Sequence, residues 1–284
     1  VIKTPVSETA PVKTNPAPEK TTPPPAPAPK PAIKEPVVSE AANPAVYITI
    51  QIGAMDGINF DETREYLDKY QWDALLVEPI PEIFNELKNN FKDRENYIFE
   101  QSAIGNHDGQ IEMLTVPLDV IEKEGLHPGF KGVSTQYPPR NGFGSDFQND
   151  IDVKNKFGVT VLVPCLTLDT LFKKHNLSKV DIFICDAEGY DWEIFKNFDF
   201  IKYHPYFIRL EYINLTNSEK DLIKTKLEQN GYVVEIGDNI DGVLQSIWNK
   251  INVEQIIPQP IIKPEKTIYL VMLKTRKMIM RYLK

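Results

Sequence analysis

The hydrophobic and polar positions of this chain follow two alternating patterns from residue 46 onward. Short apolar runs of strand type end in small or acidic residues, and the stretches between them have the spacing of amphipathic helices. The predicted strands are 46–52, 74–78, 97–102, 111–116, 159–163, 180–185 and 206–210. The predicted helices are 62–70, 81–91, 168–175, 190–197 and 218–229, the last with Ser218 as its N-cap. Strands separated by helices predict βαβ units and a mainly parallel α/β sheet.

The C-terminal part departs from this alternation twice. Residues 231–236 and 243–248, joined by a polar turn at 237–242, predict an antiparallel hairpin that closes the sheet. Residues 266–284 combine apolar positions with lysines and arginines, which predicts a basic amphipathic helix. Such a helix could contact an anionic membrane or a partner, but packing on its own domain is the favoured interpretation.

Shifts in composition predict the domain organisation. Residues 1–44 hold many of the 23 prolines and almost no aromatics, so they cannot bury enough apolar surface to fold and should form a disordered linker. A role as a proline-rich ligand is the less favoured alternative. Residues 45–250 form the predicted main domain, and 251–284 a C-terminal extension. Within the domain, 117–157 is rich in Gly, Pro, Asn and Ser, which indicates an irregular lid or substrate loop.

The net charge and the spacing of the two cysteines limit which partners and which cellular compartment the sequence suggests. The net charge of −8 argues against a nucleic acid, because phosphate backbones bind clustered Lys and Arg. No apolar run approaches the ~20 residues of a membrane span. Cys165 and Cys185 have no metal-binding spacing and lie in apolar strand-like runs, so we expect buried, reduced thiols in the cytoplasm. Because the sequence starts at Val1 without a signal peptide, we expect a fragment or a domain behind an upstream segment.

The clearest chemical signal is the glycine turn after the first strand. The run VYITIQIGAMDG stops at Gly53 and resumes at Asp56 and Gly57, and the second strand ends in Glu78. In open α/β sheets, a glycine turn and an acid roughly 20 residues later bind a nucleoside at the carboxyl ends of the strands. The turn lacks the GxGxxG spacing that a nicotinamide or flavin pyrophosphate requires, so a nicotinamide-dependent oxidoreductase is disfavoured.

Acidic residues follow two later strands. Asp186 and Glu188 come after the strand 180–185, and Glu211 ends the strand 206–210. Acids after adjacent strands can converge, where they could take a proton from a hydroxyl group or hold a divalent cation, although the sequence assigns no metal ligand. Asp191 is better explained as a cap of the next helix. Of the four histidines, only His127 lies where it could meet a substrate.

Five segments stand in order along the chain: QIGAMDG, LLVEPIPEIFNELKNN, SAIGN, VDIFICDAEGYDWEIFKNFDF and IRLEYINL. Their resemblance to the FkbM family of S-adenosylmethionine-dependent methyltransferases covers about 46–248. It implies a Rossmann-like seven-stranded sheet, mainly parallel with an antiparallel last strand, and with helices on both faces. It also implies cofactor contacts that run from the methionine part, through the ribose, to the adenine. The expected contacts are Gly53, Ala54, Asp56 and Gly57, then Glu78, then Ser102 and Ala103, together with Asp186.

The sequence therefore predicts an S-adenosylmethionine-dependent O-methyltransferase that acts on a hydroxyl group of a sugar, glycan or small molecule. Asp186 is the expected general base, with Glu188 or Glu211 as a substitute or metal ligand. The alternative is a binding or scaffold module that keeps the fold without catalysis. The acceptor, metal dependence and oligomeric state have no readable signal in the chain.

Overall fold

The computed structural model describes residues 48–59, 61, 63–136, 148–212, 214–236 and 269–274, all of which belong to the compact unit Pro44–Lys284. The predicted linker 1–44, the predicted strand 243–248 and most of the extension 251–284 lie outside the described residues. Among the described helices, none combines the length and the apolar composition that a membrane span requires.

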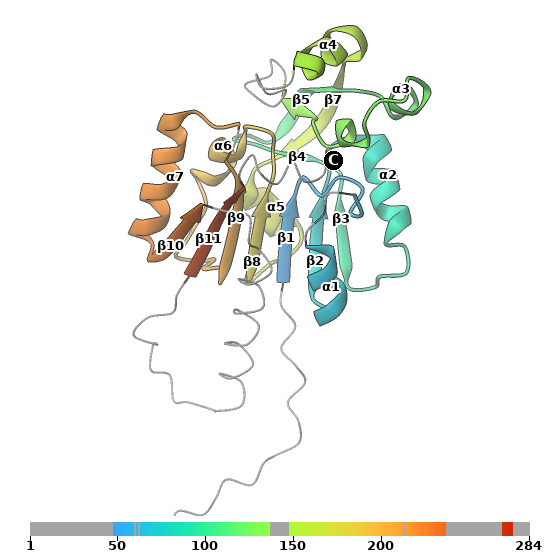
Figure 1. The fold of residues 1–284 in the computed structure, drawn as a ribbon. Coiled ribbons are helices and arrows are strands. Elements are labelled where there is room, and N and C mark those ends of the chain that lie inside the picture. The colour runs from blue at the N-terminus through green and yellow to red at the C-terminus, as the bar shows by residue number, and fades with distance from the viewer. Residues whose placement is uncertain are drawn as a thin grey trace, which may run out of the picture. The chain divides into compact units, whose positions relative to one another are not determined.

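The main sheet has the strand order β10-β11-β9-β8-β1-β2-β3, and all of its neighbouring pairs are parallel (Figure 1). The strands are β1 (Ile48–Ile52), β2 (Asp73–Val77), β3 (Tyr97–Glu100), β8 (Ile182–Cys185), β9 (Phe207–Glu211), β10 (Tyr232–Ile236) and β11 (Tyr269–Lys274). The prediction of an α/β protein with a mainly parallel sheet is confirmed. Because β1 lies between β8 and β2, the chain reverses its direction of winding there, which is where α/β sheets bind ligands.

The prediction of an antiparallel last strand is wrong for the described sheet. The strand that pairs with β10 is β11, and it runs parallel to both β10 and β9. Strands β10 and β11 are far enough apart in the sequence for parallel pairing. The predicted hairpin partner, 243–248, lies outside the described residues, so the hairpin itself stays a prediction. Strand β11 also corrects the predicted helix 266–284, because Tyr269–Lys274 is a strand.

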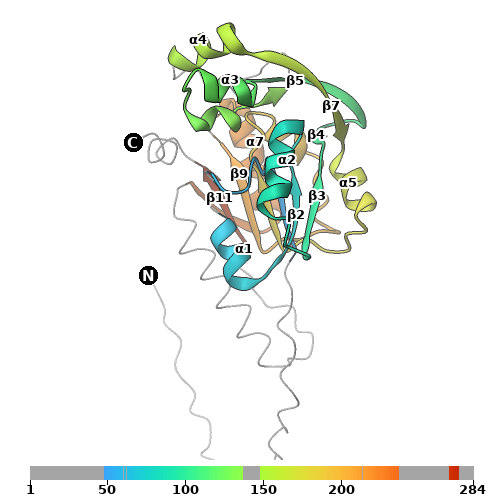
Figure 2. The same cartoon turned by 90° about the vertical axis from the view of Figure 1, so that its right-hand side faces the viewer.

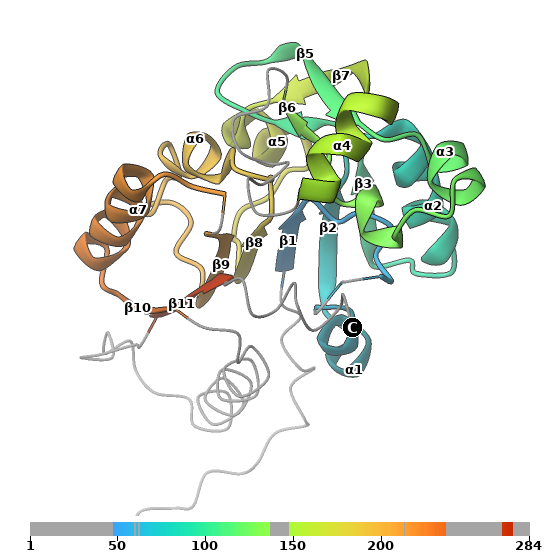
Figure 3. The same cartoon turned by 45° about the horizontal axis from the view of Figure 1, so that its top comes forward.

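Helices cover both faces of the main sheet (Figure 3). On β2, Leu75 and Val77 pack in a core with α5 (Leu168–Lys174), α6 (Asp191–Phe195) and α7 (Asn217–Gln229). The alternate residues Ala74 and Leu76 pack in a second core with α1 (Arg64–Tyr70) and α2 (Pro81–Asn90). This two-sided burial explains why the strands read as continuous apolar runs.

Helix α7 begins one residue earlier than predicted. Its N-cap is Thr216, whose hydroxyl accepts the amide hydrogen of Glu219 while the Glu219 carboxylate accepts the amide of Thr216. This capping box satisfies two amides that a helix start would leave unpaired. Ser218 is therefore inside the helix, and the prediction that it is the N-cap is wrong.

A second sheet, which the sequence did not predict, lies above the carboxyl ends of the main strands (Figures 1 and 2). Its order is β4 (Ala103–Ile104), β7 (Val159–Leu166), β5 (Gly109–Thr115), β6 (Thr135–Gln136). The segment 117–157, predicted to be irregular, contains in its described part α3 (Leu118–Lys123), the 3₁₀ helix η1 (Pro128–Lys131), β6 and α4 (Gln148–Phe157). We refer to 117–136 as the insertion; its residues Ile121 and Phe130 pack with Leu114 and Val116.

Candidate active site

The turn after β1 joins three strands at their carboxyl ends. The amides of Gly53 and Ala54 both donate to the carbonyl of Val77, the last residue of β2. Gly53 has a φ of +77°, and a Cβ added there would lie 2.0 Å from the carbonyl oxygen of Asp186. Only glycine allows both the backbone conformation and this close approach. The predicted glycine turn is therefore packed directly against the end of β8.

Asp56 and Gly57 shape the remainder of this turn. The buried Asp56 carboxylate accepts the amides of Ile58 and Asn59 and the side-chain amide of Asn59. Gly57 has a φ of +69°, and a Cβ there would collide with Phe91 and Leu87. Both residues organise the loop, since Asp56 accepts hydrogen bonds from its own turn.

Glu78 faces this turn from the end of β2. Its Oε2 accepts the amide of Met55 at 3.1 Å and its Oε1 accepts the amide of Ile80 at 2.9 Å. Burial raises the pKa of the Glu78 carboxyl to about 7, and the negative charge of Asp56 adds to the rise. A carboxylate has about four acceptor positions, so Glu78 retains acceptor capacity for further donors. The expected proximity of the glycine turn and Glu78 is confirmed.

The end of β3 carries a buried hydroxyl group. Ser102 has no exposed surface, and its Oγ has no hydrogen-bond partner among the described residues. A buried hydroxyl group without a partner is costly unless a ligand or water satisfies it. Ala103, which follows it, is buried in β4. Because β2 separates β3 from β1, this position is two strands from the glycine turn.

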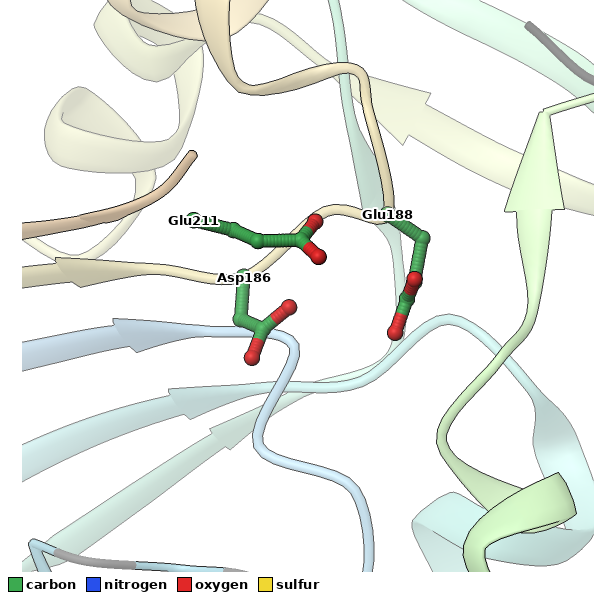
Figure 4. A group of neighbouring side chains, drawn as sticks. All are labelled: Asp186, Glu188 and Glu211. Atoms are coloured by element: carbon green, nitrogen blue, oxygen red, sulfur yellow. The ribbon is translucent and has the colours of Figure 1, made fainter. Parts of the chain in front are cut away.

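The structure brings Asp186, Glu188 and Glu211 together (Figure 4). One carboxylate oxygen from each lies within 4.8 Å of the others. The side-chain amide of Asn214 donates to both glutamates, at 2.9 Å to Glu188 and 2.8 Å to Glu211. The predicted convergence of these acids is confirmed. Their oxygens are of the kind that accept a proton or bind a hard cation.

The turn after β8, which carries Asp186 and Glu188, is supported by Asp191. This residue has no exposed surface, and its carboxylate accepts the amide of Ala187 at 3.3 Å. Burial, and then the negative charge of Asp186, raises the pKa of Asp191 to about 8. Asp191 lies in the first turn of α6, at the start of the helix as predicted, although the N-cap position itself is Tyr190. Its contact with Ala187 also supports the acidic turn.

Two residues of the insertion reach the site, and sequence reasoning missed both. Thr135 Oγ1 donates to the carbonyl of Glu188 at 3.2 Å. Lys131 Nζ lies 3.8 Å from Asp56 Oδ2 and 2.8 Å from Glu86 Oε2. Neither lies in a repeating pattern, so no local signal identified them. His127, the histidine predicted to lie where it could meet a substrate, has an exposed ring. Its Nδ1 accepts the amide of Gly129 and so caps η1.

The cysteines agree with the prediction from sequence. Cys165 in β7 and Cys185 in β8 are both free and buried. Burial raises the pKa of the Cys165 thiol to about 11, so it is protonated at neutral pH. Neither thiol has the exposure that a reactive nucleophile needs.

Comparison with known proteins identifies the family. A family model described as the methyltransferase FkbM domain matches residues 51–234, which include the glycine turn, Glu78, Ser102 and the three clustered acids. Searches of curated proteins and of solved structures found no match. Since the matched segment is more than half of the chain and contains the site, the protein belongs to the FkbM methyltransferase family.

Proposed function

We propose that the protein is a cytoplasmic, Rossmann-like O-methyltransferase that uses S-adenosylmethionine and acts on a hydroxyl group of a sugar, glycan or small molecule. The observation that carries the proposal is the contact between Glu78 Oε2 and the Met55 amide, at 3.1 Å. It joins the acid after β2 to the glycine turn after β1 in a chain of a methyltransferase family. That pairing suits the ribose of a nucleoside cofactor.

The residues along the strand ends fit such a cofactor. Glu78 would accept the ribose hydroxyls, and the unpartnered Ser102 Oγ offers a hydrogen bond beside the adenine. The backbone of Gly53 and Ala54 would border the methionine part. The cofactor supplies a methyl group on a positively charged sulfur, which is already activated for transfer.

The protein then has to position the acceptor, remove its proton and exclude water. Asp186 is the proposed base, because it follows β8 directly beside the glycine turn and lies in the acidic cluster. Its carboxylate would take the hydroxyl proton as the new carbon–oxygen bond forms. Glu188 and Glu211 would accept hydrogen bonds from neighbouring hydroxyls, or replace Asp186 as the base. The insertion, which contacts Glu188 through Thr135, would cover the acceptor.

The three clustered acids also match the ligand set of a divalent cation. A cation requirement is a separate expectation, because the base mechanism needs only the carboxylates. Dialysis against a chelator, followed by assays with and without added Mg²⁺ or Mn²⁺, distinguishes the two.

Calorimetry and a transfer assay test the proposal together. The wild-type protein should bind S-adenosylhomocysteine and transfer a labelled methyl group to one member of a panel of sugars, oligosaccharides and hydroxylated metabolites. Asp186→Asn should bind the ligand as the wild type does, and transfer should fall by at least ~100-fold, the contribution typical of a general base. Asp221→Asn, on the exposed surface of α7, is the matched control.

The results separate the candidate functions. Unchanged transfer by Asp186→Asn would remove Asp186 from the mechanism. Failure of the wild-type protein to bind S-adenosylmethionine or S-adenosylhomocysteine would favour the alternative, a binding module without catalysis.

A further inference from the structure

Lys131 has a mostly buried side chain whose ammonium group lies close to two carboxylates. Its side chain is 15% exposed, and Nζ lies 2.8 Å from Glu86 Oε2 and 3.8 Å from Asp56 Oδ2. The two carboxylates carry more negative charge than one lysine can balance. Lys131, from the insertion, neutralises part of that charge.

The ammonium group has donor capacity left over. It carries three N–H donors, and within the described part of the chain it donates one hydrogen bond, to Glu86. The 3.8 Å separation from Asp56 is too long for a hydrogen bond. An N–H donor that a ligand takes from water forms its strongest hydrogen bond with an anionic acceptor. The remaining N–H groups therefore suit an anionic group that enters beside the glycine turn.

The backbone next to Lys131 is fixed against this turn. A Cβ added at Gly132 would lie 3.0 Å from Met55 Sδ, so the insertion packs closely on Met55. Met55 in turn donates its amide to Glu78. The backbone beside Lys131 is therefore packed against the glycine turn, and this packing keeps the lysine next to the turn.

We propose that Lys131 binds the α-carboxylate at the amino-acid end of the cofactor. The inference rests on the proposed function, which locates that end of the cofactor beside Gly53 and Ala54. A carboxylate that entered there would be repelled by Asp56 and Glu86. Lys131 supplies the opposite charge at that point, so it distinguishes a cofactor that carries the carboxylate from one that lacks it.

Binding of two ligands that differ by one group tests the proposal. S-adenosylmethionine and its decarboxylated form share the adenosine, the sulfonium and the amine, and differ in the carboxylate. Both are titrated by calorimetry into the wild type, Lys131→Met and Lys131→Arg. Lys123→Met, an exposed lysine of α3 in the same insertion, is the matched control.

Lys131→Met should weaken binding of S-adenosylmethionine by about 10- to 100-fold, the range of a hydrogen bond to a charged group. Binding of the decarboxylated ligand should change by less than about threefold, which also shows that the variant is folded. Lys131→Arg should restore most of the loss, and Lys123→Met should bind both ligands as the wild type does.

Equal weakening of both ligands by Lys131→Met would show a structural role and overturn the proposal, as would no weakening of either. In both cases the wild type still binds S-adenosylmethionine, so the proposed function stands. Failure of the wild type to bind either ligand would overturn the proposed function and this inference with it.

Discussion

Replacing Glu78 with glutamine should change how the stability of the protein depends on pH. The pKa of this buried carboxyl rises from its usual 4.5 to about 7 in the folded protein, with burial as the main cause. The folded state therefore holds a proton that the unfolded chain has already released in this range. Stability from this group is fully present below pH 4.5 and is lost as the pH rises through about 7. At 1.36 kcal/mol per pKa unit, the loss is about 3 kcal/mol.

Glutamine at position 78 does not titrate, so the variant lacks this loss. Its amide can accept a hydrogen bond from Met55 or Ile80 but presents an NH₂ group to the other, which costs about 1–3 kcal/mol at every pH. Glu78→Gln should therefore be less stable than the wild type in acid, and the gap should close or reverse by about pH 8. Asp191 also has a raised pKa, but it is present in both proteins and cancels.

Urea unfolding curves at a series of pH values measure this difference directly. The free energy of unfolding of Glu78→Gln, minus that of the wild type, should rise by about 3 kcal/mol from acid to mildly alkaline pH. Glu65→Gln, at an exposed residue of α1, is the matched control. Parallel curves for Glu78→Gln and the wild type would refute the idea that Glu78 is buried with a raised pKa.

Two further predictions concern the backbone. Gly53→Ala should cost at least about 2 kcal/mol more stability than Gly125→Ala, because position 53 adds a clash with Asp186 to the strain of a positive φ, whereas nothing lies within 4 Å at position 125. Chemical denaturation measures both, and equal losses would contradict the close approach. Thr216→Ala should lose about 1 kcal/mol, whereas Ser218→Ala should be nearly neutral, because Thr216 is the N-cap of α7. A larger loss for Ser218→Ala in thermal melts would argue against that assignment.

The strand ends were predictable because their signals are local. Each parallel strand buries both faces, so it reads as an apolar run, and the polar residue after it reaches the same edge of the sheet. Glu78 and Asp186 could therefore be identified without coordinates. The convergence of Glu188 and Glu211 also followed from the order of the strands, since β8 and β9 are neighbours.

The parts that the sequence could not give depend on pairing between distant segments. Strand β5 pairs with β7 across the whole insertion, so no turn residue marks the second sheet. The run Tyr269–Lys274 is short and apolar with a basic end, which fits a helix or a strand equally until its neighbours are known. Lys131 is one of many lysines in the sequence, and only its position between Asp56 and Glu86 distinguishes it.

The position of β11 has a consequence for any shortened form of the protein. This strand joins β10 to β9, and its last residue, Lys274, is aligned with Glu211. A chain cut at the end of the family match would leave β9 as an open sheet edge, a template for aggregation, right beside the acidic cluster. Since the ribosome makes this strand after all the others described, the described sheet can be completed only once residue 274 has been synthesised.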